Sequence, residues 1–577
     1  MSAETELSYS HGTSAITLLG ETIGENLRRV AAAAAGDQEA LVDVPSGRRW
    51  TYRQLDADVD AIAAGLIAAG IEAGDRVGIW APNCAEWVLL QYATARIGAI
   101  LVNINPAYRS HELGFVLRQS GVRLLVSAES FRTSDYRAMV GEVRGGLDEL
   151  ERVIYLGTAD WDDLVAAGAL AARAEAAGAG SGAAGAGSGA AGTGTAGRAG
   201  ELAARAAGLS FDDPINIQYT SGTTGFPKGA TLSHHNILNN GFFIGEGCRY
   251  TPADRVCIPV PFYHCFGMVL GNLACTTHGA CIVIPAPGFE PAATLRAVQQ
   301  ERCTSLYGVP TMFIAELGMP DFASYDLSTL RTGIMAGSPC PVEVMKRVVS
   351  EMHMSEVTIC YGMTETSPVS AQTTADDDME RRVSTVGRVH PYVEVKIIDP
   401  ESGLVLPRGV PGEMCTRGYS VMLGYWNEPE KTAEAIDPAR WMHTGDLAVM
   451  DAAGYLNIVG RSKDMVIRGG ENVYPREVEE FLYGHPAIED VQVIGVPDEK
   501  YGEELCAWVK LRQGGELTAD DVRAYCTGKI AHYKVPRYVR FTSEFPMTVT
   551  GKVQKFKMRE VSIAELGLQA ASETATA

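Results

Sequence analysis

The strongest local signal in the sequence is residues 219–229, which read YTSGTTGFPKG. The segment INIQYT at residues 215–220 alternates apolar and polar residues, as a half-buried strand does. Three glycines let backbone N–H groups approach an anion closely, and the Ser and Thr hydroxyls add donors. Lys228 supplies a point charge for a phosphate. We therefore predict a phosphate-binding loop at the end of a strand.

Several well-known catalytic motifs are excluded. A Walker A loop needs Gly before its Lys and Ser or Thr after it, whereas Lys228 lies between Pro227 and Gly229. The sequence also contains no HExxH zinc motif and no GxSxG nucleophile elbow.

The residues around the loop predict an α/β body. Short apolar runs at residues 76–80 and 100–104 alternate with helical patterns, such as the amphipathic one in residues 50–75, which predicts βα units and a largely parallel sheet. Residues 256–289 carry no charged side chain, but prolines and polar residues interrupt them, so we expect buried strands and a core helix. Three short segments farther on predict a small β-rich subdomain: residues 393–398, 412–416 and 455–459.

Composition marks further boundaries. Every residue from Ala176 to Gly197 is Gly, Ala, Ser or Thr, which predicts a flexible surface insertion over residues 174–200. After Gly460 a helix pattern at residues 475–485 precedes a strand pattern at residues 491–498, typical of a compact α+β domain. Within it, residues 529–559 hold eight basic residues against one acidic residue, which fits either a solvated face or a surface for a polyphosphate ligand.

Four more motifs follow the loop in order: YGMTET (residues 361–366), TGD (444–446), GRSKD (460–464) and PMTVTGK (546–552). Together the five motifs resemble those of the acyl-adenylate-forming superfamily, which includes acyl-CoA synthetases, luciferases and peptide-synthetase adenylation domains. Five further segments resemble the medium-chain fatty acyl-CoA synthetases: PFYHCFG (261–267), YGVPTMF (307–313), AGSPCP (336–341), GYSVMLGYW (418–426) and VIRGGENVYPREVEE (466–480).

The resemblance implies an α/β fold with two α/β subdomains and a small β-barrel-like subdomain in one N-terminal body, followed by a small mobile α+β domain. We expect the body over residues 1–460, the C-terminal domain over 461–565 and a disordered tail over 566–577. The implied activity is an ATP-dependent fatty acid–CoA ligase that forms an acyl-AMP and pyrophosphate, then an acyl-CoA and AMP. ATP, CoA and Mg²⁺ are the implied ligands, with a medium-chain fatty acid as the carboxylate.

The resemblance also implies the residues that bind ATP. Thr364 would bond a phosphate oxygen and Glu365 would hold Mg²⁺, a hard cation suited to oxygen ligands. Asp446 and Arg461 would bind the ribose, since a carboxylate facing a diol accepts two hydrogen bonds. Lys552 would reach the α-phosphate and carboxylate oxygens during adenylation. The other nucleotide-site residues are Thr220, Ser221, Gly222, Thr223, Thr224, Gly225, Phe226, Pro227 and Lys228 for the β- and γ-phosphates, with Gly337, Ser338 and Tyr361.

Other residues are implied for the acyl chain, for CoA and for domain motion. Small residues, Gly267, Gly337 and Gly362, would leave room for an alkyl chain, and Gly469 and Gly470 would let the pantetheine arm pass close to the backbone. Lys463 lies at the hinge position, where only backbone angles need to change. The acyl pocket is expected to consist of His264, Phe266, Gly267, Gly362 and Met363, together with Gly337 and Ser338. We treat His264 as pocket lining, because a carboxylate arrives ionised and needs no general base.

The net charge narrows the classes of binding partner, and the cysteines indicate the cellular compartment. The 577 residues include 49 Lys and Arg against 70 Asp and Glu, a net charge of −21, which disfavours nucleic acid and anionic lipid as partners. Twelve scattered cysteines without a CxxC pair indicate reduced thiols, and repeated zinc-ligand spacing is lacking. With no apolar signal region at the N-terminus, we expect a cytoplasmic protein without a transmembrane segment.

Two alternatives remain beside the fatty acid–CoA ligase. One is an acyl-AMP ligase that loads a carrier protein, or a ligase for aryl or other carboxylates. The other is a non-catalytic nucleotide-binding scaffold, which would be expected to lack Lys552, Glu365 or Asp446. The acyl chain length stays open at this stage, and so does the oligomeric state, with a homodimer among the options.

Overall fold

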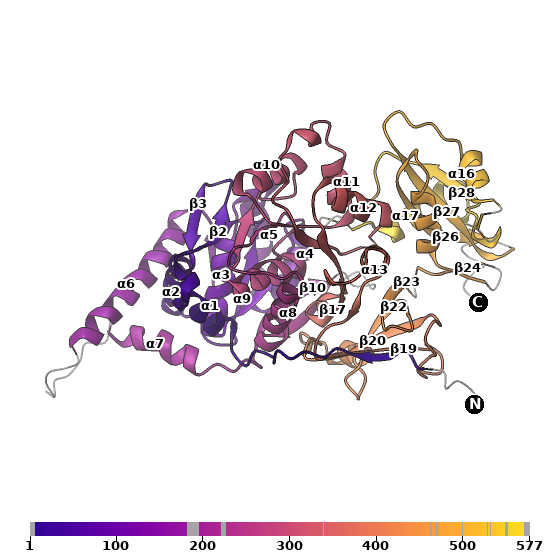
Figure 1. The fold of residues 1–577 in the computed structure, drawn as a ribbon. Helices are drawn as coiled ribbons and strands as arrows, with labels where there is room; N and C mark the ends of the chain where they lie inside the picture. The colour runs from indigo at the N-terminus through magenta and orange to yellow at the C-terminus, as the bar shows by residue number, and fades with distance from the viewer. Residues whose placement is uncertain are drawn as a thin grey trace.

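The computed structural model describes residues 6–181, 196–220, 227–338, 340–461, 464–468, 471–498, 500–527, 529–530, 532–548 and 552–569. Figure 1 shows an elongated molecule in which the last sheet and its helices form a lobe at one end. The α/β class, the two α/β subdomains, the small β subdomain and the C-terminal α+β domain are confirmed.

The first α/β subdomain is built on a seven-stranded sheet. Its parallel part joins β10, β5, β4, β6 and β9, and β11 and β21 add antiparallel edge strands. In sheet order the strands are β21 (Gly424–Tyr425), β11 (Lys228–Ser233), β10 (Pro214–Thr220), β5 (Ile100–Asn103), β4 (Arg76–Trp80), β6 (Val122–Ser127) and β9 (Arg152–Tyr155). The hairpin between β10 and β11 carries the predicted phosphate loop.

The second α/β subdomain is built on a nine-stranded sheet. Strands β2, β13, β12, β14, β15 and β16 run parallel, and antiparallel strands close both edges. In sheet order the strands are β18 (Arg388–Val389), β17 (Val369–Gln372), β16 (Glu356–Gly362), β15 (Thr332–Ala336), β14 (Ser305–Gly308), β12 (Arg255–Cys257), β13 (Cys281–Ile284), β2 (Glu39–Asp43) and β3 (Arg48–Thr51).

Helices cover these sheets and supply the core between them. The largest cluster of buried side chains joins α1, α2, α3 and α8 to η2, a π-helix. The helices before residue 210 are α1 (Ile23–Ala32), α2 (Tyr52–Ala68), α3 (Ala85–Ile97), α4 (Ser110–Ser120), α5 (Tyr136–Arg144), α6 (Ala159–Ser181) and α7 (Ala196–Ala207). Those of the second half of the body are α8 (His234–Gly247), η2 (Phe266–Leu273), α9 (Ala274–His278), α10 (Pro291–Glu301), α11 (Pro310–Leu317), α12 (Val342–Glu351), α13 (Met379–Ser384) and α14 (Pro429–Ala435).

Local sequence explains where several helices begin and end. Thr51 caps α2 in a capping box with Gln54, and Ser233 caps α8 in the same way with Asn236. Gly98 ends α3 in the left-handed conformation, with φ of 73°. Within residues 256–289 the structure places η2, α9 and β13, as the interrupted apolar run predicts. Among the described residues, no helix combines the length and the apolarity needed to cross a membrane.

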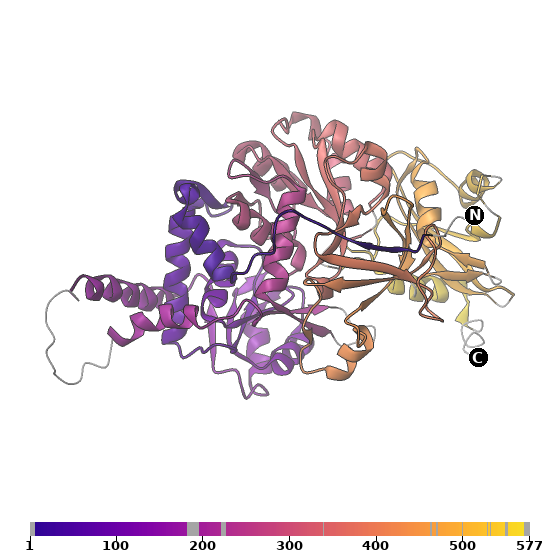
Figure 2. The ribbon, with the colours of Figure 1, turned by 60° about the horizontal axis from the view of Figure 1, so that its bottom comes forward.

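The Ala-rich insertion is helical at both ends. Helix α6 runs to Ser181 and α7 starts at Ala196, so the helices extend into the segment expected to be flexible. Alanine is the strongest helix former, and α6 gains support by packing along α2. Figure 2 shows α6 and α7 projecting together from the body. The expectation of flexibility for residues 182–195 lies outside the described residues.

A five-stranded antiparallel sheet forms the small β subdomain. The N-terminal strand β1 (Tyr9–His11) pairs with β19 (Val393–Ile398), so the chain start lies along a sheet formed almost 400 residues later (Figure 2). The other strands follow in the order β20 (Gly412–Gly418), β22 (Met442–Met450) and β23 (Leu456–Arg461).

The C-terminal part has its own sheet and its own core. Its strands are β25 (Glu471–Val473), β24 (Val466–Arg468), β27 (Gly502–Leu511) and β26 (Ile488–Asp498), with β28 (Tyr538–Phe541) parallel to β27. Its helices are α15 (Pro475–Tyr483), α16 (Ala519–Cys526) and α17 (Lys555–Leu566). Among the described residues, the two clusters of buried side chains in residues 466–568 contain no member from the body. Of the predicted tail, residues 570–577 lie outside the described part.

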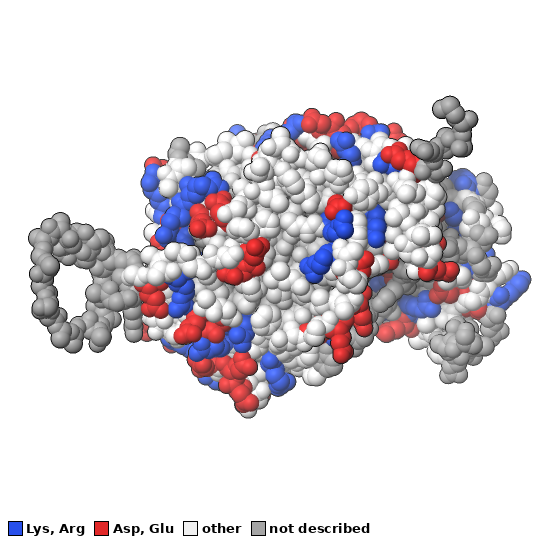
Figure 3. Space-filling view, turned by 90° about the horizontal axis from the view of Figure 1, so that it is seen from below, with Lys and Arg blue, Asp and Glu red and all other residues white. Residues whose placement is uncertain are grey.

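The surface charge is mixed. On the face in Figure 3, acidic and basic side chains are interspersed around a broad area without charged side chains. Where its residues are described, this face carries no continuous basic patch of the kind that nucleic acid binding requires.

Candidate functional site

The predicted site residues gather where parallel strands of both large sheets end. Thr220 ends β10, Gly337 and Ser338 follow β15, and Tyr361 and Gly362 end β16. Ligands of open α/β sheets bind outside the carboxyl ends of the strands, so this is the expected place for a binding site.

The carboxylate of Glu365 lies at the centre of a hydrogen-bonded network. Glu365 is 5% exposed and belongs to η4 (Thr364–Thr366), the short helix that follows β16. Its Oε1 accepts hydrogen bonds from the Tyr425 hydroxyl, at 2.8 Å, and from Thr220 Oγ1, at 3.4 Å. Lys228 Nζ donates to the same Tyr425 hydroxyl at 3.0 Å and lies 4.2 Å from the centre of its ring.

Strand pairing explains how these four residues meet. Thr220 lies opposite Lys228 in the β10–β11 hairpin, and β21, which ends in Tyr425, pairs with β11. Tyr425 was not predicted as a site residue, since nothing in GYSVMLGYW singles out one tyrosine. Burial raises the pKa of Tyr425, and the Glu365 charge raises it further, so Tyr425 stays a neutral donor.

Thr364 connects η4 to the start of the π-helix. Its side chain is buried, and its Oγ1 lies 3.8 Å from Sγ of Cys265. Burial raises the pKa of Cys265 to about 12, so the thiol is neutral and serves as a packing and hydrogen-bonding group.

Asp446 faces Tyr361 across two sheets. The Tyr361 hydroxyl donates to Asp446 Oδ2 at 2.7 Å, and the Asp446 N–H donates to Thr444 Oγ1 at 3.1 Å. Both the carboxylate and the backbone of Asp446 are therefore held in place. Arg461 pairs with Asp446 through the backbone of β22 and β23, although its side chain is outside the described residues.

Lys552 acts on His264 from the other domain. His264 precedes the π-helix, and its Nδ1 accepts a hydrogen bond from the Phe266 N–H at 3.2 Å. Burial and, second, the positive charge of Lys552 lower the pKa of His264 to about 4. The Thr548 N–H donates to the Lys552 carbonyl oxygen at 2.7 Å, and the Lys552 N–H donates to Thr548 Oγ1 at 3.0 Å. The structure therefore places the last sequence motif beside the site in the body.

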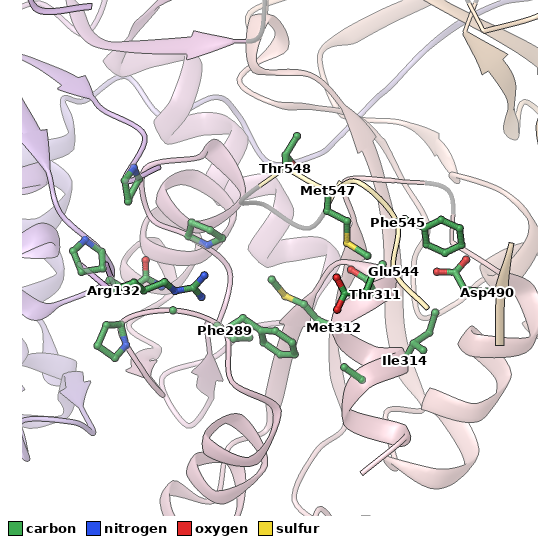
Figure 4. A pocket seen from close by; sticks show the side chains of 18 of the residues that line it. Arg132, Phe289, Thr311, Met312, Ile314, Asp490, Glu544, Phe545, Met547 and Thr548 are labelled. Carbon is green, nitrogen blue, oxygen red and sulfur yellow. The ribbon is translucent and has the colours of Figure 1, made fainter. Parts of the chain in front are cut away.

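A cavity of about 520 Å³ lies between the body and the C-terminal domain (Figure 4). Body residues Tyr263 and Met312 line it, facing Met547 and Thr548 of the C-terminal domain. None of the residues expected in the acyl pocket lines this cavity, although Tyr263 is the neighbour of His264. Phe266 instead packs against Tyr307, with ring centres 5.7 Å apart, and Met363 packs on the main core.

The structure gives a second reason for the pocket glycines. A Cβ on Gly267 would lie 2.4 Å from Pro261 O, and one on Gly362 would lie 1.7 Å from Pro368 O. Gly337 has φ of +90°, which disfavours other residues. Backbone contact and conformation therefore require these glycines, whether or not an alkyl chain passes them.

The basic stretch of residues 529–559 is largely neutralised. Of its eight basic residues, five form ion pairs with acidic residues: Lys534–Glu477, Arg537–Asp498, Arg540–Glu565, Lys555–Glu479 and Arg559–Glu503. The net charge counted from the sequence of this stretch is therefore larger than the positive charge that a ligand would meet. Other predicted site residues lie outside the described part: Ser221, Gly222, Thr223, Thr224, Gly225, Phe226, Lys463, Gly469 and Gly470.

Two family models match most of the chain. The model of the AMP-binding enzymes matches residues 27–426, and that of the AMP-binding enzyme C-terminal domain matches residues 477–552. The chain belongs to the AMP-binding enzyme family. The superfamily expected from the five motifs is confirmed.

Full-length relatives carry acyl-CoA synthetase names. The Bacillus subtilis protein YngI, assigned by name to the acyl-CoA synthetases, is 48% identical over 96% of this chain and 99% of its own. Medium-chain acyl-CoA ligase ACSF2, mitochondrial, from Danio rerio is 44% identical over 97% of this chain and 91% of its own. The human protein of that name is 42% identical over 97% of this chain and 91% of its own.

Solved structures share the fold over almost the whole chain. The anthranilate CoA ligase AuaEII in complex with anthranoyl-AMP has a TM-score of 0.81 and 26% identity, covering 95% of this chain and 98% of its own. ATP-bound MatB from Rhodopseudomonas palustris has a TM-score of 0.76 and 28% identity, covering 94% of this chain and 99% of its own.

Proposed function

We propose that this family member is an ATP-dependent acyl-CoA ligase acting on fatty acids, with medium-chain acids as its preferred substrates. What supports the proposal is the electrostatic influence of Lys552 on His264, whose neighbour Cys265 lies 3.8 Å from Thr364 Oγ1. Lys552 would supply a cation from the C-terminal domain where negative charge must be neutralised. The relatives' names support the acyl-CoA chemistry, and the ACSF2 names support the chain length.

In the first step, a carboxylate oxygen attacks the α-phosphorus of ATP and the bond to pyrophosphate breaks, giving an acyl-AMP. The carboxylate is ionised at neutral pH, so no proton needs to be removed. Lys552 would hold the α-phosphate and carboxylate oxygens in a partly dry site, where a cation is most effective. His264, neutral near pH 7 because its pKa is about 4, would line the carboxylate site without adding charge.

The remaining predicted residues would hold the nucleotide. Residues 220–228, ending in Lys228, would bind the β- and γ-phosphates with Thr364, and Asp446, oriented by Tyr361, would bind the ribose with Arg461. Gly337 and Ser338 lie at the same strand ends and would border the adenylate.

The residues around Glu365 fit Mg²⁺. The group offers a carboxylate and the hydroxyls of Thr220 and Thr364, all oxygen donors of the kind this ion prefers. When bound, the ion would neutralise charge on the ATP phosphates. Tyr425 and Thr220 would keep the Glu365 carboxylate turned toward it.

In the second step, the CoA sulfur attacks the acyl carbonyl carbon, the bond to AMP breaks, and the thiol proton leaves to solvent. We propose that residues 461–565 rotate about Lys463 between the steps, removing Lys552 and bringing Gly469 and Gly470 to the pantetheine arm. Support for a boundary near Gly460 is that β23 and β24 belong to different sheets and that each part has its own core. The twelve cysteines, all free, support a reducing compartment such as the cytoplasm.

The test measures carboxylate-dependent pyrophosphate release for a series of fatty acids of increasing chain length and for aromatic acids, with and without CoA. We expect turnover that peaks at medium chain length and that yields acyl-CoA when CoA is present. Pyrophosphate release without acyl-CoA formation would favour the ligase that loads a carrier protein. If no acid supports turnover, the proposal is wrong.

A further inference from the structure

Three side chains with metal-binding chemistry meet on the small β subdomain, outside the nucleotide site. Glu413 and Cys415 lie on β20 and His443 lies on β22, and the pairing of the two strands sets Cys415 directly opposite His443. A register irregularity between Glu413 and Cys415 brings Glu413 to the same place. One ligand atom from each residue lies within 4.8 Å of the others.

Two of the three distances between the ligand atoms match the edges of a metal tetrahedron. His443 Nδ1 lies 3.6 Å from Cys415 Sγ and 3.1 Å from a Glu413 carboxylate oxygen, Oε2. Zinc bonds of about 2.3 Å to sulfur and about 2.0 Å to nitrogen or oxygen imply tetrahedral edges of about 3.5 Å and about 3.3 Å. The two edges that include His443 therefore already have lengths suited to zinc, and the third, between Cys415 and Glu413, is within 4.8 Å.

The donor types select the class of ion. A thiolate, an imidazole and a carboxylate suit zinc and similar transition metals, whereas Mg²⁺ and Ca²⁺ prefer oxygen donors. Cys415 is fully buried, but the side chains of His443 and Glu413 are 34% and 16% exposed, so an ion can enter from their side.

The ordinary interpretation is an ion pair between His443 and Glu413. Strand register adds the Cys415 sulfur at 3.6 Å from the same ring nitrogen, so a third metal-binding donor lies beside this pair. Glu413 also accepts a hydrogen bond from the Gly445 N–H at 3.3 Å through its other oxygen, Oε1. The cluster is thereby connected to the turn that carries Asp446.

We propose that Glu413, Cys415 and His443 form a binding site for a zinc ion, or a transition-metal ion of the same class, with a fourth position open to solvent. The ion ties β20 to β22 next to the Thr444–Asp446 turn, and its binding displaces the Cys415 thiol proton to solvent. This site does not depend on the proposed ligase activity.

The test is titration of the metal-free full-length protein with cobalt(II), which reports a thiolate ligand through a sulfur-to-metal absorption band. We expect one cobalt per chain, a band that zinc abolishes by displacement, and a higher melting temperature with zinc. Cys415→Ser should remove the band and His443→Gln should weaken cobalt binding at least tenfold. Cys506→Ser, at a buried cysteine of the C-terminal sheet, should leave both unchanged.

Far-UV circular dichroism of each variant verifies folding. His443→Gln keeps the test decisive if Cys415→Ser does not fold, because His443 is partly exposed. The proposal is overturned if folded wild-type protein shows no sulfur-to-cobalt band. It is equally overturned if the folded variants at Cys415 or His443 bind cobalt as wild type does.

Discussion

Single side chains around Glu365 carry much of the proposed chemistry. The Tyr425 hydroxyl connects Lys228 to Glu365, so one group orients both the proposed phosphate-binding cation and a candidate Mg²⁺ ligand. No motif points to this tyrosine. Its role follows from the pairing of β21 with β11, which brings residues about 200 positions apart into contact.

We expect Tyr425→Phe to lower kcat/KM for ATP about 10-fold to 100-fold, because hydrogen bonds to charged groups contribute about 1.5–3 kcal/mol. The Mg²⁺ concentration for half-maximal rate should rise as well. Steady-state pyrophosphate release measures both quantities. Tyr392→Phe is the matched control, since that hydroxyl donates to the Ile16 carbonyl, at the N-terminal segment. Equal kinetics for the two variants would show that Tyr425 has no positioning role.

The second prediction concerns the protonation of His264. Lys552 disfavours the imidazolium form, so Lys552→Ala should raise the pKa of His264 above about 4, while burial, the larger cause, keeps it below 6.5. The pH dependence of the wild-type adenylation rate should accordingly show no change caused by titration of His264 between pH 6 and 8. Titration of the His264 ring by NMR in both proteins measures the shift. An unchanged pKa would mean that the two residues are not neighbours in solution.

Secondary-structure elements position the site through close backbone contacts. The π-helix η2 begins at Phe266, directly after His264, and Gly267 lets it pack on the backbone of Pro261 and Phe262. π-Helical turns occur frequently at functional sites.

Gly267→Ala should therefore destabilise the body by about 1–3 kcal/mol and reduce adenylation, because the added methyl meets backbone atoms that cannot yield. Gly141→Ala is the matched control. Gly141 lies in α5, and a methyl group added there would meet no atom of another element within 4 Å, so alanine should stabilise by about 0.5–1 kcal/mol. Urea unfolding and pyrophosphate release measure the pair. Equal stability of the two variants would contradict this account of η2.

Secondary-structure elements could be predicted from the sequence where local patterns are strong. The strand before the phosphate loop, the helix at residues 475–485 and the β segments of the small subdomain all appear. The contacts that could not be predicted depend on pairing between strands that are far apart in the sequence. Tyr425 joins Glu365 through β21, and Cys415 meets His443, 28 residues away, through strand register, although no zinc-ligand spacing is visible in the sequence.

At the level of the whole molecule, buried histidines make stability depend on pH. Burial lowers the pKa of both His234 and His390 to about 3. Protons therefore bind the unfolded chain preferentially, and stability falls as the pH drops below about 6.5 and levels off near pH 3. Each histidine should cost about 2 kcal/mol between pH 7 and pH 5.

His390→Gln should remove the part of the loss in stability between pH 7 and pH 5 that His390 causes. This expectation holds whatever the substitution does to stability at pH 7. The measurement is urea unfolding at pH 7 and at pH 5 for wild type and variant. His532→Gln, at an exposed position, is the control and should keep the wild-type difference between the two pH values. A full wild-type difference in His390→Gln would show that His390 is not neutral in the folded protein.

The whole molecule has a body with the candidate nucleotide site and a C-terminal domain that carries Lys552, with a cavity of about 520 Å³ between them (Figures 1 and 4). If the C-terminal domain alternates between two positions, Lys552 should act in only one half-reaction. Lys557, exposed on α17 of the same domain, offers a matched control for a change in charge.

The decisive measurement compares the two half-reactions in Lys552→Ala, with Lys557→Ala beside it. We predict that Lys552→Ala slows carboxylate-dependent pyrophosphate release by about 100-fold to 1000-fold, the usual cost of losing one charge-stabilising group. Acyl-CoA formation from supplied acyl-AMP should stay within about threefold of wild type, and Lys557→Ala should change neither rate. An equal loss of both half-reactions in Lys552→Ala, or no loss of the first, would contradict the account.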